Sequence, residues 1–184
     1  MMRPIGRALR GAADLLALLG AVALVWMMVQ VAADVALKNL VSLNAPFTQT
    51  LATKWAMVAA AFLPLALTEV LDRHISVEIA FQHFPPRARR IVGGAVCLYA
   101  SVVTAALVWP MWTEALKRFA AGSFELEAGE AMITWPPFFF LPLGFGLFSA
   151  VLLHRAVVLW TGAESGMGET RIDAPASDLP RADH

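Results

Sequence analysis

The sequence predicts an all-α integral membrane protein with four transmembrane helices. Hydrophobic residues make up 59% of its 184 residues, and charged residues only 15%. The apolar residues form long blocks, whereas a soluble domain of this length would distribute them as periodic faces. A bilayer crossing takes about 20 mostly apolar residues, and each block has about that length. We expect a transmembrane domain over residues 1–160, with spans at about 14–36, 51–71, 91–113 and 134–157.

The first block is uncharged between Asp14 and Asp34 and follows three arginines. A cleavable signal peptide is an alternative, but its apolar core is about 7–15 residues long. This block is longer and further spans follow it, so we expect an uncleaved signal anchor.

The second span contains two charged residues, Lys54 and Glu69. An ionised side chain at the centre of the bilayer costs about 2.5–3.5 kcal/mol on insertion scales. Both residues lie toward the ends of the span, so Lys54 can extend outward and Glu69 is expected close to the lipid head groups. Pro64 lacks a backbone donor and should kink this helix.

The fourth span opens with Pro136-Pro137, which suits the first turn of a helix, where a backbone donor has no internal partner anyway. Pro142 should kink this helix. Gly144 and Gly146 allow a neighbouring helix to approach closely, or they reflect the general frequency of glycine in membrane helices.

Polar groups deep inside the spans are few, namely Gln30, Ser101, Thr104 and Ser149. A self-contained transporter or pump usually places ionisable or polar groups along the substrate path. Hydroxyl groups in membrane helices more often bond one helix to another. The spans therefore indicate a bundle that supports another component.

Lysine and arginine residues predict the orientation, because cytoplasmic connections carry an excess of them. Three lie in the N-terminal segment, four in the connection 72–90 and three toward the C-terminus, against four in the two remaining connections. We therefore expect both termini in the cytoplasm and a multi-pass protein of the bacterial inner membrane. Four tryptophans lie at the ends expected to face outward, where indole rings favour the interface: Trp55, Trp109, Trp112 and Trp135.

The connection 72–90 predicts a short amphipathic helix lying in the membrane interface. Val77, Phe81 and Phe84 recur at helical spacing, and Pro85-Pro86 ends the pattern. The arginines that follow, Arg89 among them, would lie among anionic head groups. The same stretch partly alternates, so a strand or a bare cytoplasmic loop are the alternatives; an unpaired strand edge beside a bilayer would be costly.

The sequence contains little that indicates a catalytic, metal-binding or cofactor-binding site. His74 and Glu78 would share a helix face, but a lone pair at this spacing is weak evidence for a metal site. The histidines lie near the cytoplasmic boundary, where they are poorly placed to hold haem between spans. No nucleophile–base pair or phosphate loop is evident, and zero net charge gives no reason to expect nucleic acid. We expect no enzyme activity, no cofactor and no metal.

An ordered set of short motifs resembles the small membrane subunit (DctQ-like) of TRAP transporters, the tripartite ATP-independent periplasmic transporters. The similarity covers about residues 10 to 160. One departure is that family members usually carry one or two acidic residues where this chain has Gln49 and Thr50. The motifs are His74-Ile75-Ser76-Val77, Phe84-Pro85-Pro86, the segment 45–52, Thr134-Trp135-Pro136-Pro137 and Leu141-Pro142-Leu143-Gly144.

The resemblance implies a small permease subunit that scaffolds a large multi-spanning, ion-coupled membrane subunit. It also implies that the subunit helps to dock a periplasmic substrate-binding protein during uptake of an organic acid of the dicarboxylate type. Arg73 and His74 would then anchor the chain at the cytoplasmic interface, and Trp135 would lie on the docking side. The candidate subunit-interface and membrane-anchoring residues are Glu69, Arg73, His74, Val77, Phe81, Arg89, Trp55, Trp135, Pro142 and Gly144.

Three other functions are the alternatives. A membrane-anchor subunit of a respiratory-type dehydrogenase also has four helices, and it would show haem or quinone binding. The small subunit of a tricarboxylate tripartite transporter has a similar architecture. An independent small carrier would transport when reconstituted alone. The polar segment 161–184 is too poor in apolar residues to fold by itself and is expected to be a flexible tail.

Overall fold

The computed structural model describes residues 2–41, 48–71, 86–127, 130–162 and 166–167. It contains four helical segments long and apolar enough to cross a membrane, so the predicted number of spans is confirmed. The elements in chain order are α1 (Met2–Val41), α2 (Thr48–Thr50), the π-helical η1 (Leu51–Ala56), α3 (Met57–Phe62), α4 (Leu65–Val70), α6 (Pro86–Ala120), β1 (Phe124–Glu127), β2 (Glu130–Ile133), the 3₁₀ turn η2 (Pro136–Phe139) and α7 (Phe140–Thr161).

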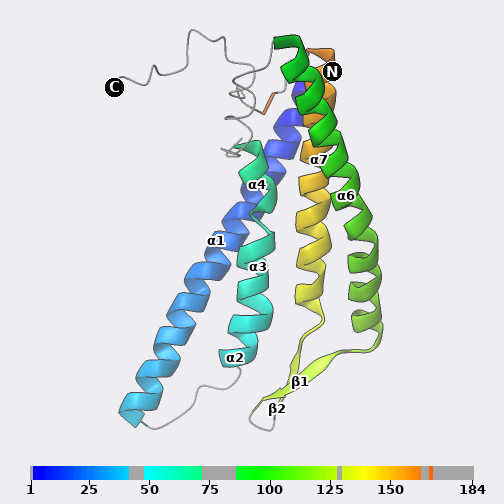
Figure 1. The fold of residues 1–184 in the computed structure, drawn as a ribbon. Helices are drawn as coiled ribbons and strands as arrows, with labels where there is room; N and C mark the ends of the chain where they lie inside the picture. Colours follow the sequence, from blue (N-terminus) through cyan, green and yellow to red (C-terminus); the bar gives the residue numbers. More distant parts are fainter. Residues whose placement is uncertain (1, 42–47, 72–85, 128–129, 163–165, 168–184) are drawn as a thin grey trace, which may run out of the picture.

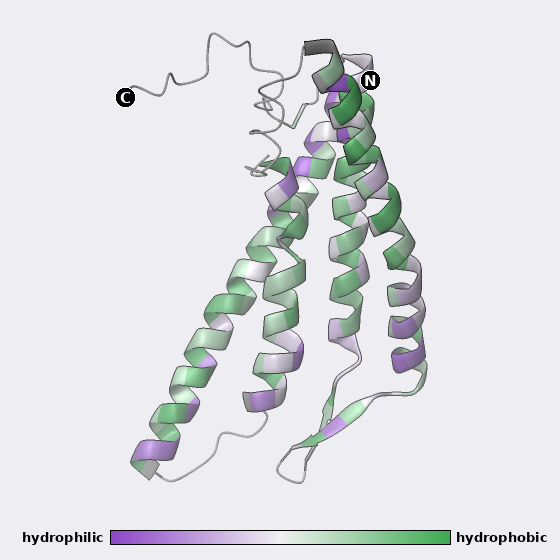
Figure 2. Ribbon diagram, viewed as in Figure 1, coloured by the Kyte–Doolittle hydropathy of each residue, from purple (hydrophilic) through white to green (hydrophobic). Residues whose placement is uncertain are grey.

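The helices form a long bundle in which α1 lies beside the segment α2–α4, and α6 packs along α7 (Figure 1). We call one end of the bundle the α4 end; α1 and α6 begin there and α7 terminates there. The opposite end is the hairpin end, which carries β1 and β2. Apolar residues cover most of each helix, and polar residues gather toward the ends (Figure 2). Many large apolar side chains are exposed, as expected where lipid is the solvent.

The second helical segment is interrupted at Pro64, as its missing backbone donor predicts. α3 ends at Phe62 and α4 begins at Leu65, and the amides of Leu67 and Thr68 donate to the Pro64 carbonyl at 3.0 and 3.3 Å. On the neighbouring helix, Gly20 provides the space for the proline ring, because a Cβ there would lie 2.9 Å from Pro64 Cδ. The break therefore lies at a close crossing of α1 and the second segment.

A small buried core lies at the α4 end. It consists of Ala13 from α1, Ala66 and Val70 from α4, Val151 from α7, and Met167. Arg10 Nη1 donates to the Met167 carbonyl at 2.8 Å, which holds the segment after α7 against α1. Three helical segments are thereby joined at one end of the bundle.

The connection between α6 and η2 contains a β-hairpin that the sequence interpretation did not include. β1 and β2 pair antiparallel, with Phe124 opposite Ile133 and Glu127 opposite Glu130. Before β1, Gly122 takes a left-handed backbone conformation with φ of 57°, and the Thr134 amide donates to the Ser123 carbonyl at 3.0 Å, which closes the base of the hairpin. The all-α architecture holds for the membrane bundle, and this two-stranded ribbon extends it at one end.

Candidate functional site

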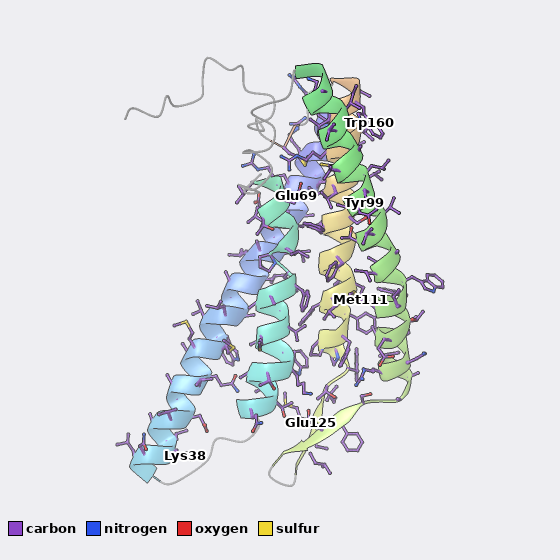
Figure 3. The ribbon with its side chains drawn as sticks, in the orientation of Figure 1. Lys38, Glu69, Tyr99, Met111, Glu125 and Trp160 are labelled. Carbon is purple, nitrogen blue, oxygen red and sulfur yellow. The ribbon has the colours of Figure 1, made fainter. Side chains whose placement is uncertain are left out.

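A buried ion pair joins α4 to α7 near the α4 end of the bundle. Arg155 Nη1 lies 2.6 Å from Glu69 Oε1 and also donates to the Glu69 carbonyl at 3.2 Å. The two side chains are only 5% and 3% exposed. Glu69 is labelled on its helix in Figure 3. A buried charge requires a counter-charge and hydrogen bonds to offset its lost hydration, and each member of this pair supplies the other with a counter-charge and a charge-assisted hydrogen bond.

The sequence predicts that Glu69 lies close to the lipid head groups, and the structure adds that its side chain is buried between α4 and α7. The missing information was Arg155, which is 86 residues away and belongs to the end of the fourth helix. The signal available in the sequence was a pair of opposite charges, each near the end of an apolar segment at the same membrane boundary.

A pair of serine hydroxyls joins α6 to α7 near the middle of these helices. Ser101 Oγ donates to the Ser149 carbonyl at 2.9 Å, and Ser149 Oγ donates to the Ser101 carbonyl at 3.1 Å. Both residues are buried. Thr104 Oγ1 instead bonds within its own helix, to the Ala100 carbonyl at 2.8 Å. The two serines therefore act between helices, as expected for hydroxyls in a membrane bundle.

The backbones of α3 and α7 approach each other closely at Gly144. A Cβ at this position would lie 2.2 Å from the Phe62 carbonyl oxygen, a distance that no real side chain tolerates. Phe62 also packs on Phe145, with ring centroids 5.8 Å apart. A Cβ at Gly146 would meet nothing within 4 Å. Of the two glycines, Gly144 is the one on which helix packing depends.

Aromatic side chains join the elements at the hairpin end. Trp135 packs edge-to-face on Phe119 of α6 and on Phe139 of η2, with centroids 4.7 and 6.2 Å apart. Trp55 of η1 donates from Nε1 to the Ile133 carbonyl at 3.3 Å, and Lys54 lies 3.7 Å from Glu125 of β1. The hairpin is thus tied to both the second and the fourth helical segments.

The structure separates the predicted site residues into two groups. Glu69 lies at the α4 end, and Trp55 and Trp135 lie at the hairpin end; Gly144 and the buried Pro142 lie near the start of α7. Pro142 falls in the first turn of α7, where its missing donor leaves the helix unbroken. Arg89 belongs to α6, and four predicted residues lie outside the described ranges: Arg73, His74, Val77 and Phe81.

Within the described ranges, no three His, Cys, Asp or Glu side chains gather as they would to hold a metal ion. The geometry described above is that of helix–helix contacts: an ion pair, reciprocal serine bonds, a glycine crossing and aromatic packing. Chemically, this arrangement can fix helices relative to one another and present a rigid surface at each end of the bundle. The pairing of Glu69 with Arg155 and the hairpin are the two features that the sequence interpretation missed.

Comparison with known proteins identifies the family. A family model described as the DctQ component of tripartite ATP-independent periplasmic transporters matches residues 27–162, well over half of the chain. No curated protein and no solved structure gives a significant match. The matched range includes both partners of the ion pair, both serines, the glycine crossing and the hairpin. The chain therefore belongs to the DctQ-component family of tripartite ATP-independent periplasmic transporters.

Proposed function

We propose that this chain scaffolds the large, ion-coupled membrane subunit of its transporter and helps to dock the periplasmic substrate-binding protein during uptake of an organic acid of the dicarboxylate type. Both termini lie in the cytoplasm of a bacterial cell in this proposal, and the hairpin end faces the periplasm. The distribution of lysine and arginine supports this orientation. The tryptophans at the hairpin end are typical of a membrane interface on either side of the bilayer.

One observation carries the scaffolding role: two buried pairs of polar residues bond one helix to another, whereas Thr104 bonds within its own helix. Glu69 and Arg155 neutralise each other across α4 and α7, and Ser101 and Ser149 bond each other across α6 and α7. A substrate path would instead need such groups to face a cavity through which an anion could move. The ion pair and the serine pair of this bundle serve its rigidity.

The proposal predicts that the large subunit depends on this chain. Purified in mild detergent, the large subunit should elute together with the chain, should unfold at a higher temperature with it than without it, and should bind the substrate-binding protein more tightly in its presence. A ligand that binds only the folded state raises the unfolding temperature by mass action. Size-exclusion chromatography tests the co-elution, thermal unfolding followed by tryptophan fluorescence measures the unfolding temperature, and biolayer interferometry measures the binding.

Trp135→Ala and Trp109→Ala provide a matched pair within the same experiment. Trp135 packs on two aromatic rings, whereas Trp109 is 75% exposed on α6. We expect the first variant to reduce binding of the substrate-binding protein several-fold and the second to change it little. Equal binding by the large subunit with and without the chain would contradict the docking role.

A further inference from the structure

The hairpin exposes a set of apolar side chains. Phe124, Leu126 and Ile133 are 61%, 68% and 54% exposed. By the strand register, Phe124 is paired with Ile133 and Leu126 with Ala131, so these four residues share one face of the ribbon. An exposed apolar face on a two-stranded ribbon marks a site of interaction when water surrounds it.

The hairpin follows a helix that extends well past two of its tryptophans. Trp109 and Trp112 are both exposed on α6, as expected of an interfacial belt. The helix continues to Ala120, eight residues beyond Trp112, which is roughly 12 Å at 1.5 Å per residue. A head-group layer is roughly 5–8 Å thick, the difference between a core of about 30 Å and a full bilayer of about 40–45 Å. The hairpin lies past the end of α6 (Figure 1), so an interface at the level of Trp109 and Trp112 would leave it on the water side.

The charge of the hairpin favours a protein over a lipid surface. The segment 124–133 contains three glutamates, at positions 125, 127 and 130, and no lysine or arginine. Anionic head groups attract basic segments and repel acidic ones. A complementary partner therefore offers an apolar patch with lysine or arginine side chains around it.

A polar cleft of about 490 Å³ lies between the hairpin and the start of the second helical segment. Lys54 and Glu125, on opposite sides of the cleft, are each about half exposed, so their polar ends are accessible. The cleft is lined by Gln49, Thr50, Thr53, Lys54, Glu125 and Leu126. It lies directly beside the exposed apolar residues and can accept a polar side chain of the same partner.

The surface is also held in one conformation before any partner arrives. Trp55 Nε1 bonds the Ile133 carbonyl, Lys54 pairs with Glu125, and the Thr134 amide bonds the Ser123 carbonyl. A surface ordered in advance loses less conformational entropy on binding. Preorganisation of this kind suits a partner that binds and leaves repeatedly.

We propose that the apolar face of the hairpin, together with the adjacent cleft, is the docking surface for the periplasmic substrate-binding protein, which contributes an apolar patch with a basic rim. This inference rests on the proposed function and names the surface that performs it. The large membrane subunit is the other protein that could cover the hairpin. A few apolar residues among carboxylates match a transient interface, since permanent interfaces are larger and more depleted of charge.

The test uses the complex of the chain with its large subunit in lipid nanodiscs, and the purified substrate-binding protein as the probe. In the double variant Phe124→Thr, Leu126→Thr, threonine keeps the strand propensity and removes the apolar surface. We expect at least ten-fold weaker binding of the substrate-binding protein, with the large subunit still present in unchanged amount. The control, Leu116→Thr, changes an apolar residue that is 44% exposed on α6 and should bind normally.

Unchanged binding by the double variant would overturn the inference, and so would loss of the large subunit from the complex, since the hairpin would then hold that subunit. The single variant Leu126→Thr alters the most exposed of these side chains, and it should weaken binding in the same direction if the double variant unfolds. A different result would contradict the proposed function: the large subunit would then bind the substrate-binding protein equally well with and without this chain. If the native chain strengthens binding and the hairpin variants retain that gain, the docking role of the chain stands and the assignment of the docking surface to the hairpin is refuted.

Discussion

Arg155→Ala is expected to destabilise the bundle by about 3–5 kcal/mol, because it leaves the Glu69 carboxylate buried without its counter-charge. Glu69→Ala should have a comparable effect, since it leaves the guanidinium of Arg155 in the same position. In the native chain the two groups lie 2.6 Å apart and are almost completely buried. Thermal unfolding of the detergent-solubilised chain, together with its recovery in complex with the large subunit, measures the loss.

Two controls separate the charge effect from a general effect of mutation. The double variant Glu69→Leu, Arg155→Met replaces the pair with apolar side chains of similar size and should recover most of the stability, because no charge remains buried. Glu114→Ala breaks the exposed ion pair with Arg118, whose side chains are 47% and 43% exposed, keeps the contact of Arg118 with the Phe138 ring, and should change stability by about 0–1 kcal/mol. Equal destabilisation by Glu114→Ala and Arg155→Ala would contradict the importance assigned to the buried pair.

Gly144→Ala is expected to force α3 and α7 apart. The new Cβ would lie 2.2 Å from the Phe62 carbonyl oxygen, and backbone atoms of two packed helices cannot yield as a flexible side chain does. Overpacking of this kind typically costs about 1–3 kcal/mol. Alanine is favoured over glycine in a helix by about 1 kcal/mol, so a net loss of stability would show that the clash is the larger effect.

Gly146→Ala is the matched control for this variant, because it lies on the same helix and its Cβ would meet nothing within 4 Å. It should be neutral or slightly stabilising through helix propensity alone. Thermal unfolding of both variants in the same detergent provides the comparison. A Gly144→Ala protein as stable as Gly146→Ala would show that the α3–α7 crossing tolerates a wider separation.

The helices and the break at Pro64 could be predicted from the sequence because their causes are local, whereas the kink predicted at Pro142 was wrong, because this proline falls in the first turn of α7. Uninterrupted apolar blocks of bilayer length determine the number of spans, and the missing donor of Pro64 determines the break in the second. Gly144 could be named as a possible close approach. Only the structure distinguishes it from Gly146, since the difference depends on what faces each residue from another helix.

The ion pair and the hairpin depend on contacts between segments, and for that reason sequence reasoning missed them. Glu69 and Arg155 belong to helices that come together only in the folded bundle. The hairpin did have a local signal: Phe124-Glu125-Leu126-Glu127 alternates strictly, and a glycine follows at position 129. Its three glutamates gave it the appearance of a polar connection.

Solute uptake into sealed vesicles tests most directly whether this chain supports transport without conducting the solute. Vesicles containing the chain alone, the chain with the large subunit, or both with the substrate-binding protein are compared, with a radiolabelled dicarboxylate outside and an imposed ion gradient. The account predicts uptake only with all three components, and none above the protein-free background with this chain alone. Uptake by this chain alone would contradict the account, because the solute would then have a route through a bundle whose buried ion pair and serine pair bond helix to helix.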